Sequence, residues 1–319
     1  MGRQGDPDRE RDVQLLGARQ GGCVNARQLC ERGWTRSETD WRVRSGWWRS
    51  LLPGVYLVAG WAYGLEWDSL PFATRAWAAR LMHGDESVFC LQTAAKLWGI
   101  EGYGVDDATI HLRLPPGRER HQVDGVKVHT WLVRHDEVTL REEHQLTGVG
   151  RTVTDLVLRL RREPAVSVLD SALHQGLLVP EDLEELQRRA RGRRGVARSR
   201  EWWCLGDGRA ESPLETRARL IAIDAGHPPD ELQLPIVDSH GVLLGFGDLA
   251  WKRQHLRRRT MVVEADGEDV HSRPEALFRD RYRGNDIAEA GDCDLYRITW
   301  RDVMRPAYFV SLLRRNLAA

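Results

Sequence analysis

The sequence lacks the long apolar segments that mark membrane and secreted proteins. No apolar run approaches the length of a bilayer span, and the first twelve residues are polar or charged with no apolar segment behind them. The chain also has no GxxxxGK pattern, so no phosphate-binding loop of that type is predicted. We therefore expect a cytoplasmic protein with no membrane partner.

Excess charge and clustered cysteine are missing as well. The 47 basic and 47 acidic side chains give a formal net charge of +0, so only local patches could favour nucleic-acid binding. The five cysteines are scattered and have no metal-site spacing, which favours reduced thiols. They are Cys23, Cys30, Cys90, Cys204 and Cys293.

What the chain does contain fits a globular protein of mixed α/β (α+β) class. It has 319 residues, enough for two or three domains, with 41% hydrophobic and 29% charged residues. Its patterns predict three regions: a winged helix in residues 1–62, a middle α+β region in 63–205, and a mixed sheet flanked by helices in 206–319.

The order of elements in the first region predicts the winged helix: a helix, a helix–turn–helix and a β-hairpin. The expected elements are a helix around Val13, a helix over 24–30 capped by Asn25, a helix from Thr35 or Ser37 to Gly46, and two strands within 47–58 that turn at Pro53–Gly54.

The third helix of this module is the one expected to contact DNA. Its arginines would reach bases and phosphates in the major groove, and an arginine at the wing would contact phosphate. The competing interpretation is a solvated helix face, and Glu38 and Asp40 lower the local charge. Tryptophans here are more often used for packing than for base stacking. The arginines are Arg36, Arg42, Arg44 and Arg49, and the tryptophans are Trp34, Trp41, Trp47 and Trp48.

The middle region mixes helical and alternating patterns. Its arginine-rich run over 188–200 indicates a solvated helix end or linker. The predicted helices are 74–82, 87–97, 151–161, 164–176 and 181–190, and the predicted strands are 109–114 and 125–131.

The third region opens with a clear helix start. Ser212 is the expected cap, Pro213 takes the first helical position and Glu215 the third, which is a capping-box arrangement. The predicted order is helix 213–225, strands 232–237, 242–251 and 260–264, helix 274–291, strand 295–299 and helix 301–317.

Carboxylates gather where two of these strands end. Side chains alternate along a strand, so Glu264 and Asp266 point the same way, and Asp248 on the neighbouring strand would bring a third carboxylate to the same spot. Such oxygen ligands suit Mg²⁺ or Mn²⁺, although nearby arginines could also pair with the acids, and acids at strand ends can simply face water. Arg257 and Arg258, between the strands, could follow a phosphate backbone or lie in a solvated turn.

The third region resembles the PD-(D/E)xK nuclease superfamily, especially domains related to very-short-patch repair endonucleases. The matching segments are Glu211–Glu215, Gly247–Trp251, Glu264–Gly267 followed by His271, 279–291 and 298–301. The resemblance implies a restriction-endonuclease-like fold, a metal on Asp248 and Glu264, assistance from Glu215, and a histidine that orients or protonates. Asp266 stands where many members carry a lysine.

The first two regions resemble actinobacterial abortive-infection type IV antitoxins. The segments that carry the likeness are Arg49–Tyr56, Thr147–Leu156 and Leu169–Leu173. This resemblance implies a DNA-binding regulator with a partner toxin or another phage-defence protein. Two hypotheses follow: a metal-dependent DNA endonuclease with a winged-helix module, or an antitoxin-type regulator whose nuclease-like domain is inactive.

Overall fold

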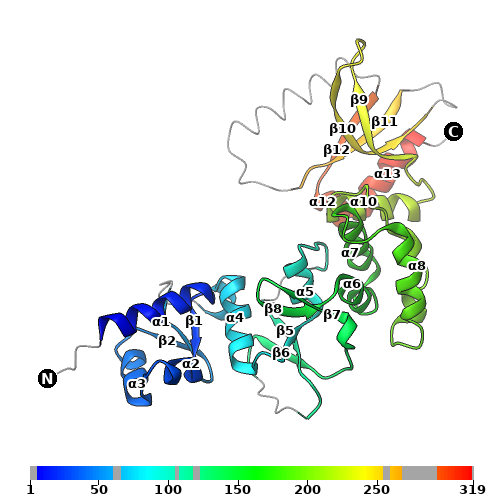
Figure 1. Ribbon diagram of the computed structural model, residues 1–319. Coiled ribbons are helices and arrows are strands. Elements are labelled where there is room, and N and C mark those ends of the chain that lie inside the picture. The colour runs from blue at the N-terminus through cyan, green and yellow to red at the C-terminus, as the bar shows by residue number, and fades with distance from the viewer. Residues whose placement is uncertain are drawn as a thin grey trace. The chain divides into compact units, whose positions relative to one another are not determined.

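The computed structural model describes residues 6–59, 66–104, 108–117, 123–253, 259–267 and 293–317, and it has the predicted mixed α/β class. Two compact units are present: Met1–Gly99 with Val105–Thr152, and Ile100–Gly104 with Val153–Ala319 (Figure 1). The division into three regions stays a prediction. Within the described ranges, no helix has both the length and the apolar character needed to cross a bilayer.

The first unit begins with the helix–turn–helix and hairpin that the sequence predicts. Asn25 and Thr35 each close a capping box, accepting a hydrogen bond from the third backbone N–H of the helix that follows. A short strand before the second helix was not predicted; it completes a sheet of order β1-β3-β2. The elements are α1 (Pro7–Arg19), β1 (Cys23–Asn25), α2 (Ala26–Glu31), α3 (Arg36–Arg44), β2 (Arg49–Leu52) and β3 (Val55–Leu57).

The rest of this unit is a five-stranded sheet of order β6-β5-β4-β8-β7 with helices. Helix α4 joins it to the winged helix: Asn25 donates to the Leu81 carbonyl at 3.1 Å, and Cys23 shares a core with Ala76 and Ile110. The elements are η1 (Trp67–Ser69), α4 (Phe72–His83), β4 (Val88–Phe89), α5 (Leu91–Trp98), β5 (Ile110–Arg113), β6 (Val126–His129), η2 (His135–Glu137), β7 (Val138–Arg141), β8 (His144–Thr147) and the start of α6 (Val149–Val157), which continues into the second unit after Thr152.

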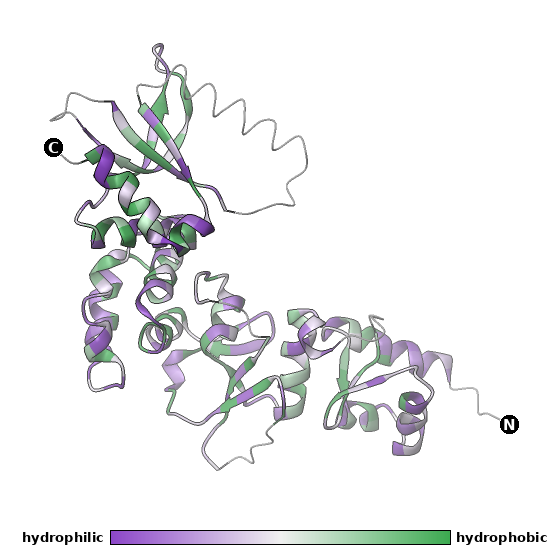
Figure 2. Cartoon of the chain, turned by 180° about the vertical axis from the view of Figure 1, so that it is seen from behind, coloured by the Kyte–Doolittle hydropathy of each residue, from purple (hydrophilic) through white to green (hydrophobic). Residues whose placement is uncertain are grey.

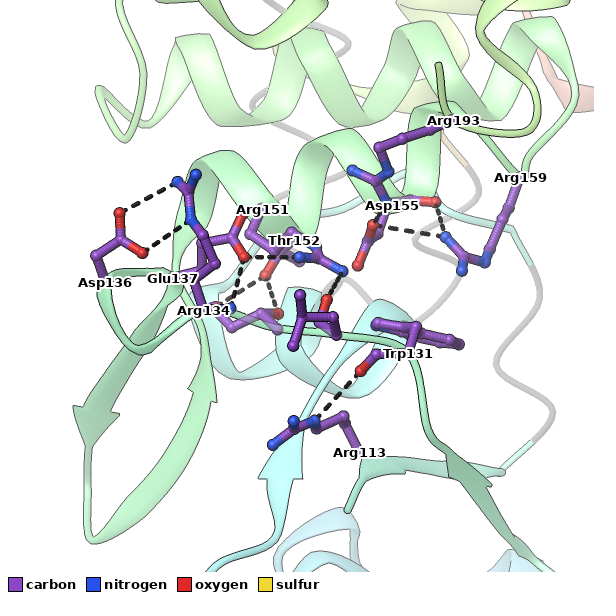
Figure 3. A network of polar contacts seen from close by, with 12 residues as sticks. Arg113, Trp131, Arg134, Asp136, Glu137, Arg151, Thr152, Asp155, Arg159 and Arg193 are labelled. Atoms are coloured by element: carbon purple, nitrogen blue, oxygen red, sulfur yellow. Dashed lines mark hydrogen bonds and ion pairs between the residues drawn. The ribbon is translucent and has the colours of Figure 1, made fainter. Parts of the chain in front are cut away.

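Helix α6 is anchored by polar side chains (Figure 3). In the first unit, Arg151 donates to Glu137 at 2.8 Å, and the hydroxyls of Thr147 and Thr152 lie 2.7 Å apart. In the second unit, the fully buried Asp155 pairs with Arg193. These residues lie in the segment Thr147–Leu156 or contact it, and their polar contacts stabilise the fold.

The second unit places a four-stranded sheet of order β12-β11-β10-β9 beside helices. Strands β11 and β12 are parallel, and the other pairs are antiparallel. Figure 2 shows apolar stretches along these strands. The elements are α7 (Arg162–His174), α8 (Pro180–Arg189), α9 (Val196–Ser199), η3 (Trp203–Leu205), α10 (Pro213–Asp224), β9 (Glu231–Val237), β10 (Leu243–Trp251), β11 (Thr260–Ala265), β12 (Cys293–Ile298), α12 (Trp300–Met304) and α13 (Pro306–Leu317).

Two helix predictions need correction. The predicted helix 87–97 begins as strand β4, whose buried Val88 and Phe89 pair inside the sheet, and becomes helical only from Leu91. The predicted closing helix 301–317 is two helices, because Pro306 disfavours the helical conformation of the residue before it. Arg305 accordingly has φ −123° and ψ 70°. The predicted helix 274–291 lies outside the described residues.

The helices α10, α12 and α13 cover one face of the second sheet. Leu214 of α10 and Phe309 of α13 pack there against Leu249 and Val263. Ala250 and Val262, the alternate residues of the same strands, contribute to a smaller apolar cluster on the opposite face.

A buried arginine ties the far end of this sheet to α13. Arg253 is 2% exposed, yet its guanidinium donates to the Arg259 carbonyl at 2.6 Å, pairs with Asp294 and approaches Asn316 at 3.4 Å. One side chain therefore connects the end of β10, the starts of β11 and β12, and the last turn of α13.

Candidate active site

Ser212 caps α10, as the sequence predicts, and Glu215 at the third helical position is buried. Ser212 Oγ accepts from the Glu215 N–H at 3.2 Å and donates to Glu215 Oε1 at 2.7 Å. Glu215 Oε2 accepts from the Glu211 N–H at 3.0 Å. The carboxylate is thus held by its own helix start while it reaches inward toward the sheet.

Gln233 of β9 links Glu215 to Asp248. Its Nε2 lies 3.0 Å from Glu215 Oε2 and 3.4 Å from Asp248 Oδ1. The other oxygen of Asp248 accepts from the Ala265 N–H of β11 at 2.7 Å. Two of the predicted acids therefore meet around an amide that sequence reasoning did not identify.

The pKa values of both acids in this pair are raised. Burial raises the pKa of Asp248 to about 6 and the charges of Glu215 and Glu211 add to the rise, against the opposing hydrogen bonds from Ala265 and Gln233. Burial also raises the pKa of Glu215. In the part of the chain that the structure describes, neither carboxylate has an ion pair with lysine, arginine or histidine, so only neutral groups compensate their charge.

The backbone is distorted where these side chains meet. Gln233 has φ +54°, which a glutamine rarely adopts. Leu232 packs on the α10 face of the sheet, whereas Leu234, two residues on, packs on the opposite face. On the neighbouring strand β10, Gly247 pairs with Leu234. It has no room for a side chain, because an added Cβ would lie 2.2 Å from Val262 Cγ1. Strain of this kind concentrates at functional sites.

Glu264 and Asp266 form a second group, at the end of β11. Glu264 lies beside Arg297 in the parallel pairing of β11 and β12, and Arg297 Nε is 3.2 Å from Glu264 Oε2 and 3.8 Å from Asp266 Oδ2. The Leu249–Val263 pair ends the β10–β11 ladder, so Asp248 and Glu264 are the next residues beyond it. Arg297 is a further site residue that the sequence analysis did not name.

The metal prediction is left open by this geometry. Among the described ranges, no group of three or more histidines, cysteines or acids is arranged to hold a metal ion. Gln233 contacts Asp248 and Glu215, whereas Arg297 contacts Glu264 and Asp266. His271, Arg257 and Arg258 lie outside the described residues.

The predicted DNA contacts on the winged helix differ in exposure. Arg36, Arg44 and Arg49 are exposed, but Arg42 is buried and pairs with Glu10 of α1. Arg42 thus fastens α1 to α3, and a phosphate contact would require its guanidinium to leave that partner. DNA binding itself stays a prediction.

Comparisons with known proteins give a family but no activity. No family model matches the chain. The crystal structure of the RV2827C protein from Mycobacterium tuberculosis is weakly similar, with a TM-score of 0.39 and 20% identity, covering 66% of this chain and 80% of that one. Uncharacterized proteins MT2308 and Rv2248, from two strains of the same species, are each 33% identical over 285 residues, covering 89% of this chain and 97% of theirs. The chain belongs to the family of these two mycobacterial proteins.

Proposed function

We propose that the protein is a metal-dependent DNA endonuclease, in which the winged helix binds DNA and the domain of residues 206–319 hydrolyses a phosphodiester. The observation that carries this proposal is the buried pair of Asp248 and Glu215, which has no cation among the described residues. Burying uncompensated carboxylates is costly, and a hard divalent ion such as Mg²⁺ or Mn²⁺ would remove that cost.

The residues around the pair have distinct roles in this proposal. Asp248 and Glu264 would hold the metal, with Glu215 assisting from α10. A bound ion would lower the pKa of its water and offset charge that develops on the phosphate. The Ala265 N–H and the Gln233 amide orient Asp248. Asp266 and His271 would assist near the phosphate, and Arg257 and Arg258 would follow the DNA backbone.

One observation favours the regulator hypothesis as a second candidate. Arg297 already gives Glu264 and Asp266 a cationic partner, as expected of a domain that has exchanged metal binding for an internal ion pair. The protein would then be an antitoxin-type DNA-binding regulator with a partner toxin or another phage-defence protein, and its nuclease-like domain would serve interaction.

The test compares cleavage of varied DNA substrates with Mg²⁺ or Mn²⁺ by the purified wild type and by Glu264→Gln. The amide keeps the shape and one oxygen but removes the charge, so a nuclease should lose cleavage while its fold and DNA affinity persist. Glu231→Gln is the matched control, because Glu231 lies on β9 with Lys252 as its partner and should leave cleavage intact. A wild type that binds DNA but cleaves none of the substrates with either metal contradicts the nuclease proposal and supports the regulator.

A further inference from the structure

The four tryptophans of the winged helix divide into a buried pair and an exposed pair. Trp34 and Trp48 are 6% and 4% exposed, with ring centres 4.7 Å apart, and belong to the module's core. Trp41 and Trp47 are 53% and 52% exposed. Packing therefore accounts for the first pair and leaves the two residues of the second pair about half exposed.

One buried arginine, Arg42, contacts both exposed rings. The Cζ atom of Arg42 lies 5.3 Å from the ring centres of both Trp41 and Trp47, so the two centres can be no more than twice that distance apart. Arg42 is itself held by its ion pair with Glu10 and by the ring of Trp34 at 5.7 Å. Cation–π contacts to a fixed guanidinium restrict both indoles.

Exposed arginines lie on the same module as the two rings, and Arg44 shares a helix face with Trp41. Ser37, Trp41 and Arg44 are spaced i, i+4, i+7 along α3 and are all exposed, so they share the solvent face of that helix. The Arg36 side chain is 95% exposed and lies 4.0 Å from the Asp40 carboxylate, whereas Arg49 is exposed at the start of the wing. An exposed aromatic ring that shares its helix face with an arginine complements a ligand that has aromatic faces and a negatively charged backbone.

We propose that Trp41 and Trp47 form a stacking platform for unpaired DNA bases, so that the winged helix prefers DNA with a single-stranded gap over a continuous duplex. The inference rests on the proposed DNA binding and adds the structural class of DNA. In a duplex the base faces are covered by their neighbours, whereas unpaired bases can stack on indoles whatever their sequence. Rings that are already restricted lose little conformational freedom when a base stacks on them.

The test measures binding of the full-length protein, without divalent metal, to a continuous duplex and to the same sequence with a short single-stranded gap. Fluorescence anisotropy should show tighter binding of wild type to the gapped DNA. Replacing both Trp41 and Trp47 by leucine should weaken that binding by at least the effect of one lost stacked base, roughly 5- to 140-fold, and should change duplex binding much less. The double phenylalanine variant keeps stacking rings and should retain most of the preference.

Two controls separate stacking from charge and from damage to the fold. Tyr308→Leu removes an aromatic ring of similar exposure, 52%, from α13 and should change neither affinity. Arg44→Gln should weaken binding to both DNAs alike and reduce the salt dependence, because a phosphate contact does not distinguish them. Thermal melting of each variant checks that the winged helix remains folded.

The outcomes distinguish the platform from the proposed function. Equal wild-type affinity for gapped and continuous DNA overturns the platform and leaves DNA binding standing. A double leucine variant that stays folded and loses duplex binding equally, or a wild type that prefers the matching single-stranded RNA, also overturns it. Wild type that binds neither DNA at low salt refutes both proposals and assigns the exposed tryptophans to a protein partner.

Discussion

Replacing Asp248 by asparagine should stabilise the protein when no divalent metal is present. The pKa of Asp248 is raised from 3.8 to about 6, chiefly by burial, so its ionised form opposes folding at neutral pH. The full shift corresponds to about 3 kcal/mol at about 1.4 kcal/mol per pKa unit, and partial exposure reduces this to about 1–2 kcal/mol. Asparagine removes the charge and keeps an oxygen for the Ala265 N–H.

The stability difference between wild type and Asp248→Asn should depend on pH. Because the folded-state pKa is raised, the stability associated with a neutral Asp248 is fully present below pH 3.8 and is lost as pH rises through about 6. Wild type and Asp248→Asn should therefore have similar stability near pH 3.8 and should differ most above pH 6.

Urea unfolding of both proteins in EDTA, across this pH range, measures the difference. Asp224→Asn is the control in the same unit: its exposed carboxylate pairs with Arg162, so the substitution should cost about 0–1 kcal/mol. Adding Mg²⁺ should stabilise wild type by mass action and should stabilise Asp248→Asn much less. If Asp248→Asn is less stable than wild type at neutral pH without metal, the account of an uncompensated buried carboxylate is wrong.

Two further predictions concern buried polar groups. The pKa of His144 is lowered to about 4 by burial, with the nearby Arg80 charge adding to it, so wild type should lose up to about 3 kcal/mol as pH falls from 6.5 to 4, and His144→Phe should flatten that loss in urea titrations. Arg219→Leu leaves Asp170 buried without its ion-pair partner and should cost about 3–5 kcal/mol in urea unfolding; adding Asp170→Leu should recover most of it, and two additive losses would contradict the reasoning.

Local features of the fold were predictable because their signals lie within a few residues. The caps Asn25 and Ser212 stand directly before the helices that they close, and the turn at Pro53–Gly54 was found from the same short-range chemistry. Strand β4 was missed because two strand residues run directly into a helix, leaving no alternation to detect. The β7–β8 hairpin was missed because β7 is largely solvent-exposed and carries little apolar pattern.

The site was predictable only in part, for a related reason. Asp248 and Glu215 lie in recognisable motifs, and the structure brings them together. Gln233 and Arg297 contact acids that are distant from them in sequence, so local patterns do not identify them. A glutamine also gives no sequence signal for a positive φ. The sequence does not distinguish Arg42 from the exposed arginines Arg36 and Arg44. In the structure its side chain instead pairs with Glu10 of α1.

The buried Arg253 has a consequence for the timing of protein synthesis. Strand β10 leaves the ribosome well before the partners of this guanidinium, Asp294 and Asn316, have been made. Until they emerge, the charge must stay hydrated, which keeps the end of the sheet open, and the core also waits for Phe309. We therefore expect the winged helix to fold on the nascent chain while the sheet of β9–β12 is still incomplete.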